Sequence, residues 1–175
     1  MDIKEVVNAF NEMEAAGLFA RYAIGGAVGA LFYLEPTDTF DVDIFISLSP
    51  VPGRLLVDIS PVTDYLIKKG GIREKEHVRI FGWPVQILAA SEGLLEEALN
   101  EALDKDIEGT FTRVFSAEHL AAIALKTGRA KDKARLLQFL EADVLDRKKF
   151  HDIIDRHGLK EVWKKFENQF LKDRP

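Results

Sequence analysis

The sequence predicts an α+β fold, with a small mixed β-sheet and its helices over residues 1–115 and a helical bundle over residues 116–175. Two observations carry this prediction. Short alternating or apolar runs bounded by glycine and proline, such as 40–47 and 77–88, are typical of strands. After residue 115, apolar residues recur only at helical spacing. The length of 175 residues suits one compact unit with a helical appendage.

Helical and strand patterns alternate through the first 115 residues. Apolar residues three and four apart, between capping residues and glycines, predict helices, and apolar–polar alternation predicts strands. The expected elements are helix 3–16, strand 19–24, buried helix 27–34, strand 40–47, helix 62–69, strands 77–81 and 84–88 around a Gly82-Trp83 turn, helix 92–103 and strand 110–114. Residues 54–59, in a proline-rich connection, fit either a short strand or one helical turn.

Four helices are expected in the last third of the chain. Ser116 is a suitable N-cap for the first helix, which should end at Gly128 because glycine readily adopts the left-handed conformation of a helix C-terminus. The remaining helices are expected at about 131–142, 146–158 and 159–170. Trp163 and Phe166 share the apolar stripe of the last helix and are interpreted as core residues.

Composition excludes several classes of protein. The chain has no cysteine, which rules out disulfide scaffolds, thiolate zinc sites and cysteine nucleophiles. It also lacks an apolar run of the roughly 18 residues that a membrane helix needs, and its first residues do not resemble a signal peptide. A cytoplasmic protein without a membrane partner is therefore expected. The four histidines show no ligand spacing among themselves and are interpreted as surface or locally bonded residues.

Charge is distributed unevenly along the chain. The net charge of −5 combines −10 over residues 1–125 with +5 over residues 126–175. A basic last third is typical of a surface that faces an anionic partner, and it is equally typical of solvated helix faces. Both interpretations stay open at this point.

Two acidic residues stand together at the start of the strand at 40–47. Asp41 and Asp43 are two positions apart, so they project from the same face of the strand while Val42 and Ile44 project from the other. Adjacent carboxylates repel each other unless a cation lies between them. Ligation by oxygen alone suits Mg²⁺ or Mn²⁺, which accept substrate phosphates as further ligands. The alternative is a pair of solvated carboxylates at a sheet edge.

Gly25 and Gly26 end the preceding strand and begin a helix. The first turn of a helix presents unpaired N–H groups, and glycine lets a phosphate approach the backbone closely. A tight turn between strand and helix is the structural alternative for such a pair. The chain contains neither a Walker P-loop nor a complete dinucleotide-binding glycine fingerprint. It also lacks the serine-hydrolase G-x-S-x-G elbow and the H-E-x-x-H zinc motif.

The order of strand, Gly25-Gly26, helix and then Thr39-x-Asp41-x-Asp43 on the next strand resembles the nucleotidyltransferase superfamily, which shares the polymerase-beta palm core. More narrowly, it resembles small bacterial nucleotidyltransferase-like proteins related to the toxins of abortive-infection and toxin–antitoxin systems. The resemblance implies that Gly25 and Gly26 contact the phosphates of a nucleoside triphosphate. It also implies that Asp41 and Asp43 are ligands of Mg²⁺ or Mn²⁺.

A later stretch adds to this resemblance. Lys126 to Asp132 is similar to the R-x-K-D segment that the family carries on its C-terminal helices. Lys126 and Arg129 would then steady the triphosphate, because cationic side chains neutralise the charge that shifts as pyrophosphate leaves. Lys131 and Arg135 are four residues apart and also fit a solvated helix face.

Two positions depart from the family pattern. Gln86 stands where relatives usually place a third carboxylate, and Thr37 stands where many carry an arginine. An amide cannot take a proton from a nucleophile or add negative charge to a metal site. In two-metal phosphoryl transfer, the third carboxylate helps to bind the metal that activates the attacking hydroxyl.

The sequence therefore supports two main hypotheses. The first is a metal-dependent nucleotidyltransferase that transfers a nucleotidyl group from a nucleoside triphosphate to a hydroxyl of an RNA or protein acceptor. The second is a catalytically degenerate nucleotide-binding or interaction module of a toxin–antitoxin-like system, with Gln86 marking the lost activity. A third is an RNA binder that uses residues 126–175. The oligomeric state stays open.

Overall fold

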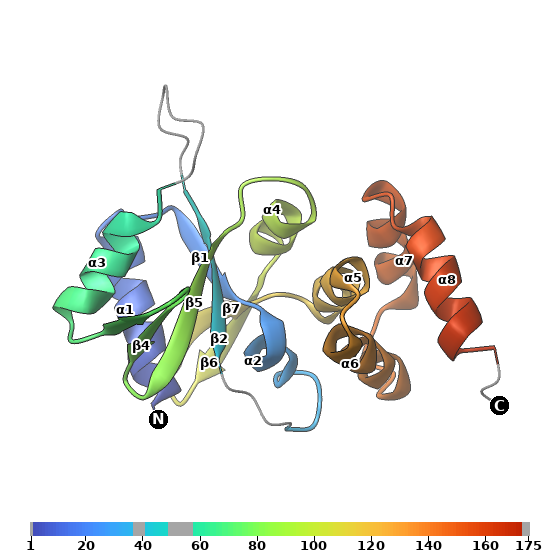
Figure 1. The fold of residues 1–175 in the computed structure, drawn as a ribbon, viewed down its shortest axis with the longest axis horizontal. Helices are drawn as coiled ribbons and strands as arrows, with labels where there is room; N and C mark the ends of the chain where they lie inside the picture. Colours follow the sequence, from blue (N-terminus) through green and yellow to red (C-terminus); the bar gives the residue numbers. More distant parts are fainter. Residues whose placement is uncertain (1, 37–40, 49–57, 173–175) are drawn as a thin grey trace.

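The computed structural model describes residues 2–36, 41–48 and 58–172. Within them, seven strands form one mixed sheet in the order β3-β4-β5-β2-β1-β7-β6, with helices on both faces and further helices at the C-terminal end (Figure 1). The predicted α+β class, with a mixed sheet followed by a helical part, is confirmed. The strands are β1 Arg21–Ile24, β2 Val42–Ser47, β3 Ile72–Glu74, β4 His77–Ile80, β5 Trp83–Ala89, β6 Leu103–Ile107 and β7 Thr110–Val114.

Local sequence signals explain where the helices begin and end. The helices are α1 Ile3–Ala15, α2 Gly26–Ala30, α3 Ser60–Lys68, α4 Gly93–Asn100, α5 Ala117–Thr127, α6 Ala130–Glu141, α7 Arg147–Arg156 and α8 Lys160–Phe170. The side chains of Asp2, Ser116 and Asp146 accept backbone N–H bonds at the starts of α1, α5 and α7. Gly128 ends α5 in the left-handed conformation, with φ at 68°.

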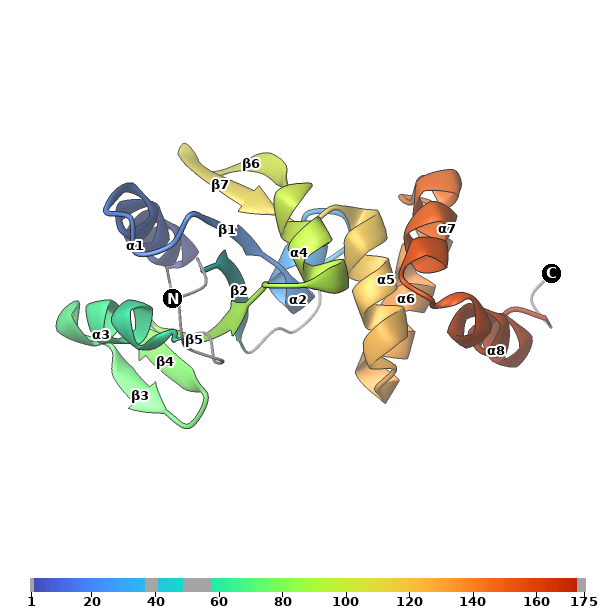
Figure 2. The same cartoon turned by 90° about the horizontal axis from the view of Figure 1, so that it is seen from above.

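Strand β2 lies at the centre of the sheet and carries the acidic pair. It runs antiparallel to β1 and parallel to β5, so its N-terminal end lies beside the start of β5. The hairpins β3–β4 and β6–β7 extend the sheet at opposite edges (Figure 2). No helix in the described part of the chain has the length and apolar character needed to cross a membrane.

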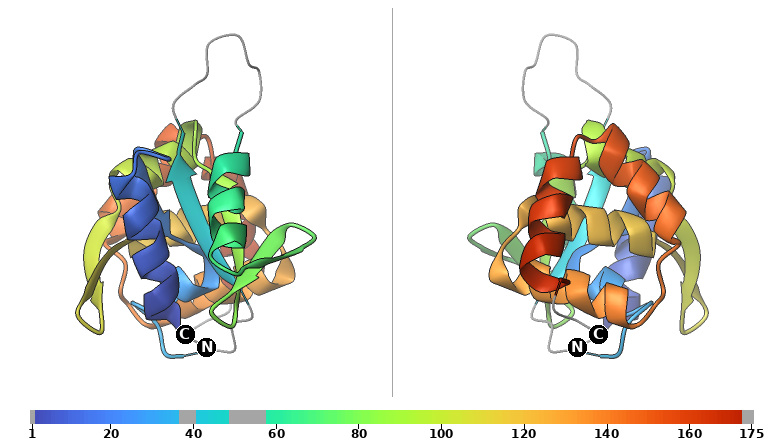
Figure 3. Two further views of the ribbon diagram at one scale, coloured as in Figure 1. Left: turned by 90° about the vertical axis from the view of Figure 1, so that its left-hand side faces the viewer. Right: turned by 90° about the vertical axis from the view of Figure 1, so that its right-hand side faces the viewer.

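Each face of the sheet covers its own hydrophobic core. On one face, α1 and α3 lie side by side (Figure 3). Val42, Ile44 and Ile46 of β2 belong to the same hydrophobic cluster as the buried apolar residues of these two helices. On the other face, Phe45 and Phe115 belong to a cluster that continues through α4 and α5 to the last helices. Since the second cluster joins residues before and after position 115, the helical part packs against the residues on this face of the sheet, with α5 in contact with α2 and α4.

Two strands were not predicted from the sequence. Strand β6 begins at Leu103, where the apolar spacing favoured a last helical turn, and α4 ends instead at Asn100. Leu103 is 42% exposed. An edge strand such as β6 bonds to a neighbour on one side only and needs no fully apolar face, so β6 lacks the alternation that marks a buried strand. Strand β3 is also an edge strand, and its three residues are all exposed, so it too lacks the alternation of a buried strand.

Several positions that carry predictions fall outside the described residues. Thr37, Thr39 and Phe40 lie in the gap before Asp41, and residues 54–57 lie in the gap before α3. The choice between strand and helical turn for 54–59 therefore stays a prediction.

Candidate active site

The acidic pair lies where β2 begins. Asp41 precedes the strand and Asp43 is its second residue, while Val42 and Ile44 are fully buried on the opposite face. Burial raises the pKa of Asp43, and the nearby charge of Asp41 raises it further. Lys131, Arg135 and His77 act in the opposite direction. The site thus concentrates negative charge that a bound cation would stabilise.

Gly26 lies directly beside the carboxylate of Asp43. Its φ is +56°, and a Cβ placed there would lie 1.9 Å from the Oδ2 atom of Asp43. Only glycine fits this position, because any side chain would collide with the carboxylate. Gly26 and Ala27 begin α2 and line the cleft above the sheet. The first N–H groups of a helix have no acceptor within it, so this turn can serve as an anion-binding surface.

Gly25 occupies a different environment from Gly26. Its N–H donates to the carbonyl oxygen of Asp43 at 3.0 Å, which continues the pairing between β1 and β2. A Cβ placed there would lie 2.4 Å from the ring of Phe45. The backbone N–H of Gly25 is therefore engaged by the sheet, and this glycine permits close packing rather than lining the cleft.

One cleft of about 730 Å³ joins the motifs that are far apart in the sequence. Its sheet wall carries Asp41, Asp43 and Gln86, and its helical wall carries cationic side chains from the end of α5 and the start of α6. These cations are Lys126, Arg129, Lys131 and Arg135. An apolar region formed by residues such as Leu88, Leu94, Leu120 and Ile123 completes the cleft. Packing of α5 against α2 and α4 thus brings the basic segment opposite the carboxylates.

Asp132 orients the basic segment. It is only 3% exposed, and its carboxylate accepts bonds from Nε and Nη2 of Arg129 at 2.6 and 3.2 Å. Arg135 lies 3.9 Å away on the same helix. A buried carboxylate needs such partners, because desolvation would otherwise be costly. The hydrogen bond to Asp132 raises the pKa of Arg129, so the guanidinium stays charged at the edge of the cleft.

Gln86 lies between Asp43 and a histidine that the sequence did not identify as a site residue. In the sheet register, Gln86 on β5 is opposite Asp43 on β2 and opposite His77 on β4. The Nε2 atom of His77 is 3.5 Å from the Oδ2 atom of Asp41. His77 thus lines the cleft, although its sequence context predicted a surface or locally bonded residue.

The comparisons with known proteins identify the fold. No family model and no curated protein sequence matches this chain. The crystal structure of ANT(2″)-Ia in complex with adenylyl-2″-tobramycin aligns with 95% of this chain and 98% of that chain, at a TM-score of 0.54 and 13% identity. The fold is that of the nucleotidyltransferases. The solution structure of the antibiotic-resistance factor ANT(2″)-Ia also aligns, over 97% of this chain and 98% of that chain. Its TM-score is 0.53 and its identity 16%.

A crystal structure of an antigenic nucleotidyltransferase-like protein from Paracoccidioides brasiliensis also aligns, over 92% of this chain and 91% of that chain. Its TM-score is 0.49 and its identity 15%.

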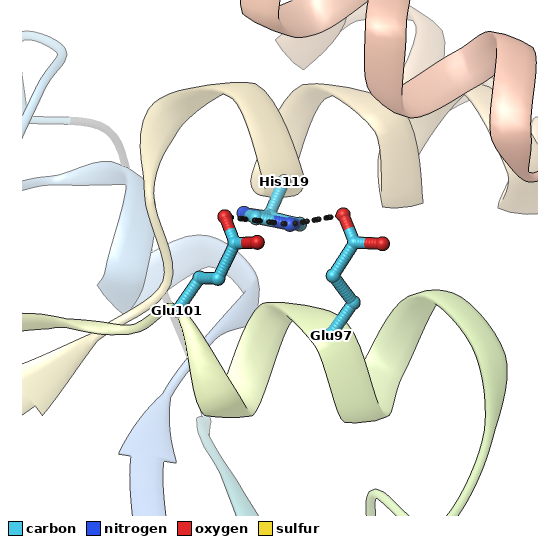
Figure 4. Close-up of side chains that lie close together, drawn as sticks. All are labelled: Glu97, Glu101 and His119. Atoms are coloured by element: carbon cyan, nitrogen blue, oxygen red, sulfur yellow. Dashed lines mark hydrogen bonds and ion pairs between the residues drawn. The ribbon is translucent and has the colours of Figure 1, made fainter.

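A second polar cluster joins the sheet unit of the nucleotidyltransferase fold to the C-terminal helices. The ligand atoms of Glu97, Glu101 and His119 lie within 4.8 Å of one another (Figure 4). His119 is fully buried, and its Nδ1 and Nε2 atoms lie 2.8 Å from Ser116 Oγ and 3.0 Å from Glu97 Oε1. Glu97 also accepts bonds from Arg156 and His157 of the C-terminal helical region.

The hydrogen bonds of His119 argue for a structural role of this cluster. Burial lowers the pKa of His119, so the ring is neutral at pH 7. The network then assigns the ring proton to Nε2, which donates to Glu97, while the Ser116 hydroxyl donates to Nδ1. A protonated Nε2 has no lone pair for a metal ion, so we interpret the cluster as a connection between α4, α5 and α7.

Replacement of Glu97 with alanine should destabilise the protein. The change leaves the buried Nε2–H of His119 without its acceptor, which costs about 1–3 kcal/mol. It also removes the partner of Arg156. Chemical denaturation measures the loss, and Glu96→Ala on the exposed side of the same helix is the matched control. Equal unfolding free energies for the two variants would contradict the structural role.

Acid should weaken the same connection. The pKa values of His119 and Glu97 both lie below their usual values of 6.5 and 4.5, through burial for His119 and chiefly through the Arg156 hydrogen bond for Glu97. The unfolded chain then binds more protons, so stability falls as pH drops below about 6.5 and falls again below about 4.5. Melting temperatures measured from pH 7.5 to 4 test this expectation. Because the raised pKa of Asp43 acts in the opposite direction, the series is repeated with Asp43→Asn, and a constant melting temperature of that variant from pH 7 to 5 would refute the His119 contribution.

Proposed function

We propose that the protein is a metal-dependent nucleotidyltransferase that binds a nucleoside triphosphate in the cleft and transfers its nucleotidyl group to a hydroxyl acceptor. The observation that carries this proposal is the convergence of three features on one cleft. These are the carboxylates of Asp41 and Asp43, the Gly26 turn, and the cations of the Lys126–Arg135 segment. The fold supports the proposal, since it is shared with ANT(2″)-Ia in complex with adenylyl-2″-tobramycin.

Asp41 and Asp43 would hold Mg²⁺ or Mn²⁺. Their carboxylate oxygens are the ligands that these ions prefer, and the buried Nε2 atom of His77 beside them has no hydrogen-bond partner among the described residues. Such an unsatisfied atom next to two carboxylates is consistent with a cation site. When bound, the ion supplies Lewis-acid polarisation of the phosphoryl oxygens.

The remaining residues of the cleft would position the nucleotide. Gly26 and Ala27 line the cleft at the start of α2, where their backbone N–H groups would donate to phosphate oxygens. Lys126 and Arg129 would neutralise the charge that develops on the departing pyrophosphate. The acceptor oxygen forms a bond to the α-phosphorus as the bond to the bridging oxygen breaks. Since Gln86 cannot accept the hydroxyl proton, that proton would pass to solvent.

The acceptor is proposed to be an RNA or a protein. The four cationic side chains of the helical wall favour an anionic or neutral acceptor over a polycation. The division at residue 115 also stays a proposal, in which residues 1–115 supply the metal ligands and residues 116–175 supply the cations. A cytoplasmic location is kept as a prediction from the sequence.

The second candidate function is nucleotide binding without nucleotidyl transfer. In it, the chain is a degenerate nucleotide-binding or interaction module of a toxin–antitoxin-like system. The position of Gln86 favours it, because this amide lies opposite Asp43, where a third carboxylate would face the metal.

Changing Gln86 to aspartate should separate the two functions. In a degenerate site, the new carboxylate restores a metal ligand, so transfer should rise by about tenfold or more from a low level. In a site that is already active, the additional charge beside Asp43 should change transfer little. The initial rate of label transfer is the measurement, with Gln86→Asn as the control for the shorter side chain.

The proposal is tested by transfer of label from α-phosphate-labelled nucleoside triphosphates. Each of the four nucleotides is incubated with Mg²⁺ and with total RNA and protein as acceptors. We expect one or more nucleotides to label an acceptor with the wild type and none with Asp41→Asn. Label transfer that is unchanged in Asp41→Asn would refute the assigned site.

A further inference from the structure

Position 77 lies in a row of residues that crosses three neighbouring strands. Asp43, Gln86 and His77 are directly opposite one another on β2, β5 and β4. All three line the same cleft, so they project from the same face of the sheet. His77 is thus one strand beyond the place where the third carboxylate is missing.

The imidazole reaches back toward the acidic pair. The side chain of His77 is 23% exposed, and its Nε2 atom lies 3.5 Å from the Oδ2 atom of Asp41. That separation is long for a hydrogen bond, and Nε2 is buried without a hydrogen-bond partner among the described residues. Two neighbouring ligands that are each about 2.1 Å from one octahedral ion lie about 3.0 Å apart. The two atoms are therefore about 0.5 Å farther apart than in such a pair, a difference that a small side-chain movement would close.

We propose that His77 is a nitrogen ligand of the metal ion held by Asp41 and replaces the carboxylate missing at position 86. The inference deepens the proposed function and rests on it. Imidazole nitrogen binds first-row transition ions such as Mn²⁺ better than it binds Mg²⁺, which strongly prefers oxygen. The site should therefore prefer Mn²⁺, and Gln86 then marks a changed ligand set.

Pulsed electron paramagnetic resonance of Mn²⁺ tests the proposal without any catalytic turnover. A coordinated imidazole gives nitrogen modulation of the Mn²⁺ signal, whereas carboxylates and water do not. The protein is measured with Mn²⁺ alone and with Mn²⁺ plus tripolyphosphate, which completes the coordination shell and contains no nitrogen. We expect nitrogen modulation in the wild type under both conditions.

Three variants assign the signal. In His77→Asn, the nitrogen modulation should disappear and Mn²⁺ should bind at least about tenfold more weakly, while Mg²⁺ binding changes less. In Asp41→Asn, Mn²⁺ binding should be lost, because this residue supplies the neighbouring oxygen ligand. Glu101→Gln alters the separate Glu97–Glu101–His119 cluster and should leave the spectrum unchanged.

The outcomes distinguish this inference from the proposed function. Mn²⁺ binding that depends on Asp41 but shows no nitrogen modulation would overturn the role of His77 and leave the proposed metal site intact. Mn²⁺ binding that is insensitive to Asp41→Asn would overturn both. Modulation that persists in His77→Asn and disappears in Glu101→Gln would place the metal in the other cluster. Absence of Mn²⁺ binding with tripolyphosphate would also overturn the inference.

Discussion

Replacement of Asp43 with asparagine is expected to lower metal-dependent nucleotidyl transfer by about a thousandfold. A bound metal contributes several kcal/mol to phosphoryl transfer, and each 1.36 kcal/mol corresponds to a factor of ten in rate. Asparagine keeps the shape of the side chain but removes the charge that holds the ion. The value of kcat/KM measures the loss. Asp64→Asn, on the exposed surface of α3, is the matched control and should retain full transfer.

The same substitution should leave the fold intact. Burial and the charge of Asp41 raise the pKa of Asp43, so the ionised form is less favourable in the folded protein than in the unfolded chain. The sign follows from linkage: Asp43 contributes most to stability below its unfolded pKa, and that contribution is lost as pH rises through its folded pKa. At pH 7, Asp43→Asn should therefore melt at or above the wild-type temperature. A lower melting temperature, or retained transfer, would contradict the assigned role.

Gly26→Ala is expected to abolish most transfer and to destabilise the protein. The methyl group would lie 1.9 Å from Oδ2 of Asp43, so the carboxylate would have to leave its position. The φ of +56° adds a backbone cost of about 1–2 kcal/mol for a residue with a Cβ. We expect a total loss of about 2–3 kcal/mol in unfolding free energy. We also expect loss of Mn²⁺ binding, measured by denaturation and by metal titration.

Gly17→Ala separates the two causes. Gly17 also has a positive φ, at +76°, but a Cβ placed there would meet no atom within 4 Å. This variant should therefore lose stability through backbone strain alone and retain metal binding and transfer. If Gly26→Ala behaves like Gly17→Ala in the metal titration, then contact between Gly26 and Asp43 does not shape the site.

The sequence predicted the main elements because their signals are local. Caps at Asp2, Ser116 and Asp146, together with the glycine stop at 128, fix the helix ends through side-chain and backbone bonds only a few residues away. Alternation in β2 likewise placed Asp41 and Asp43 on one face, because side-chain direction in a strand has a period of two.

His77 was missed because its position depends on the register of a hairpin. A turn at Gly82-Trp83 would have placed Arg79 opposite Gln86. The structure turns instead at Phe81 and Gly82, both with positive φ, and this shift places His77 opposite Gln86. A slip of one residue in the turn changes every cross-strand pair, so periodicity alone could not find this contact.

The interaction between Glu97 and Arg156 shows a second limit of sequence patterns. The two residues are 59 positions apart and meet because α5 packs against both α4 and α7. Charge patterning indicated a basic last third but assigned no partner to any individual cation. Lys126 and Arg129 were assigned to the triphosphate with the help of the family resemblance, because their placement opposite the carboxylates depends on the packing of α5 against α2 and α4.

The central claim is that one cleft holds both the metal and the triphosphate. A crystal structure with Mn²⁺ and a non-hydrolysable nucleoside triphosphate tests it most directly, since anomalous scattering locates the ion independently of the nucleotide. We predict an anomalous peak between Asp41 and Asp43, with the triphosphate between the Gly26 turn and Lys126 and Arg129. An ion or a triphosphate bound outside this cleft would contradict the account.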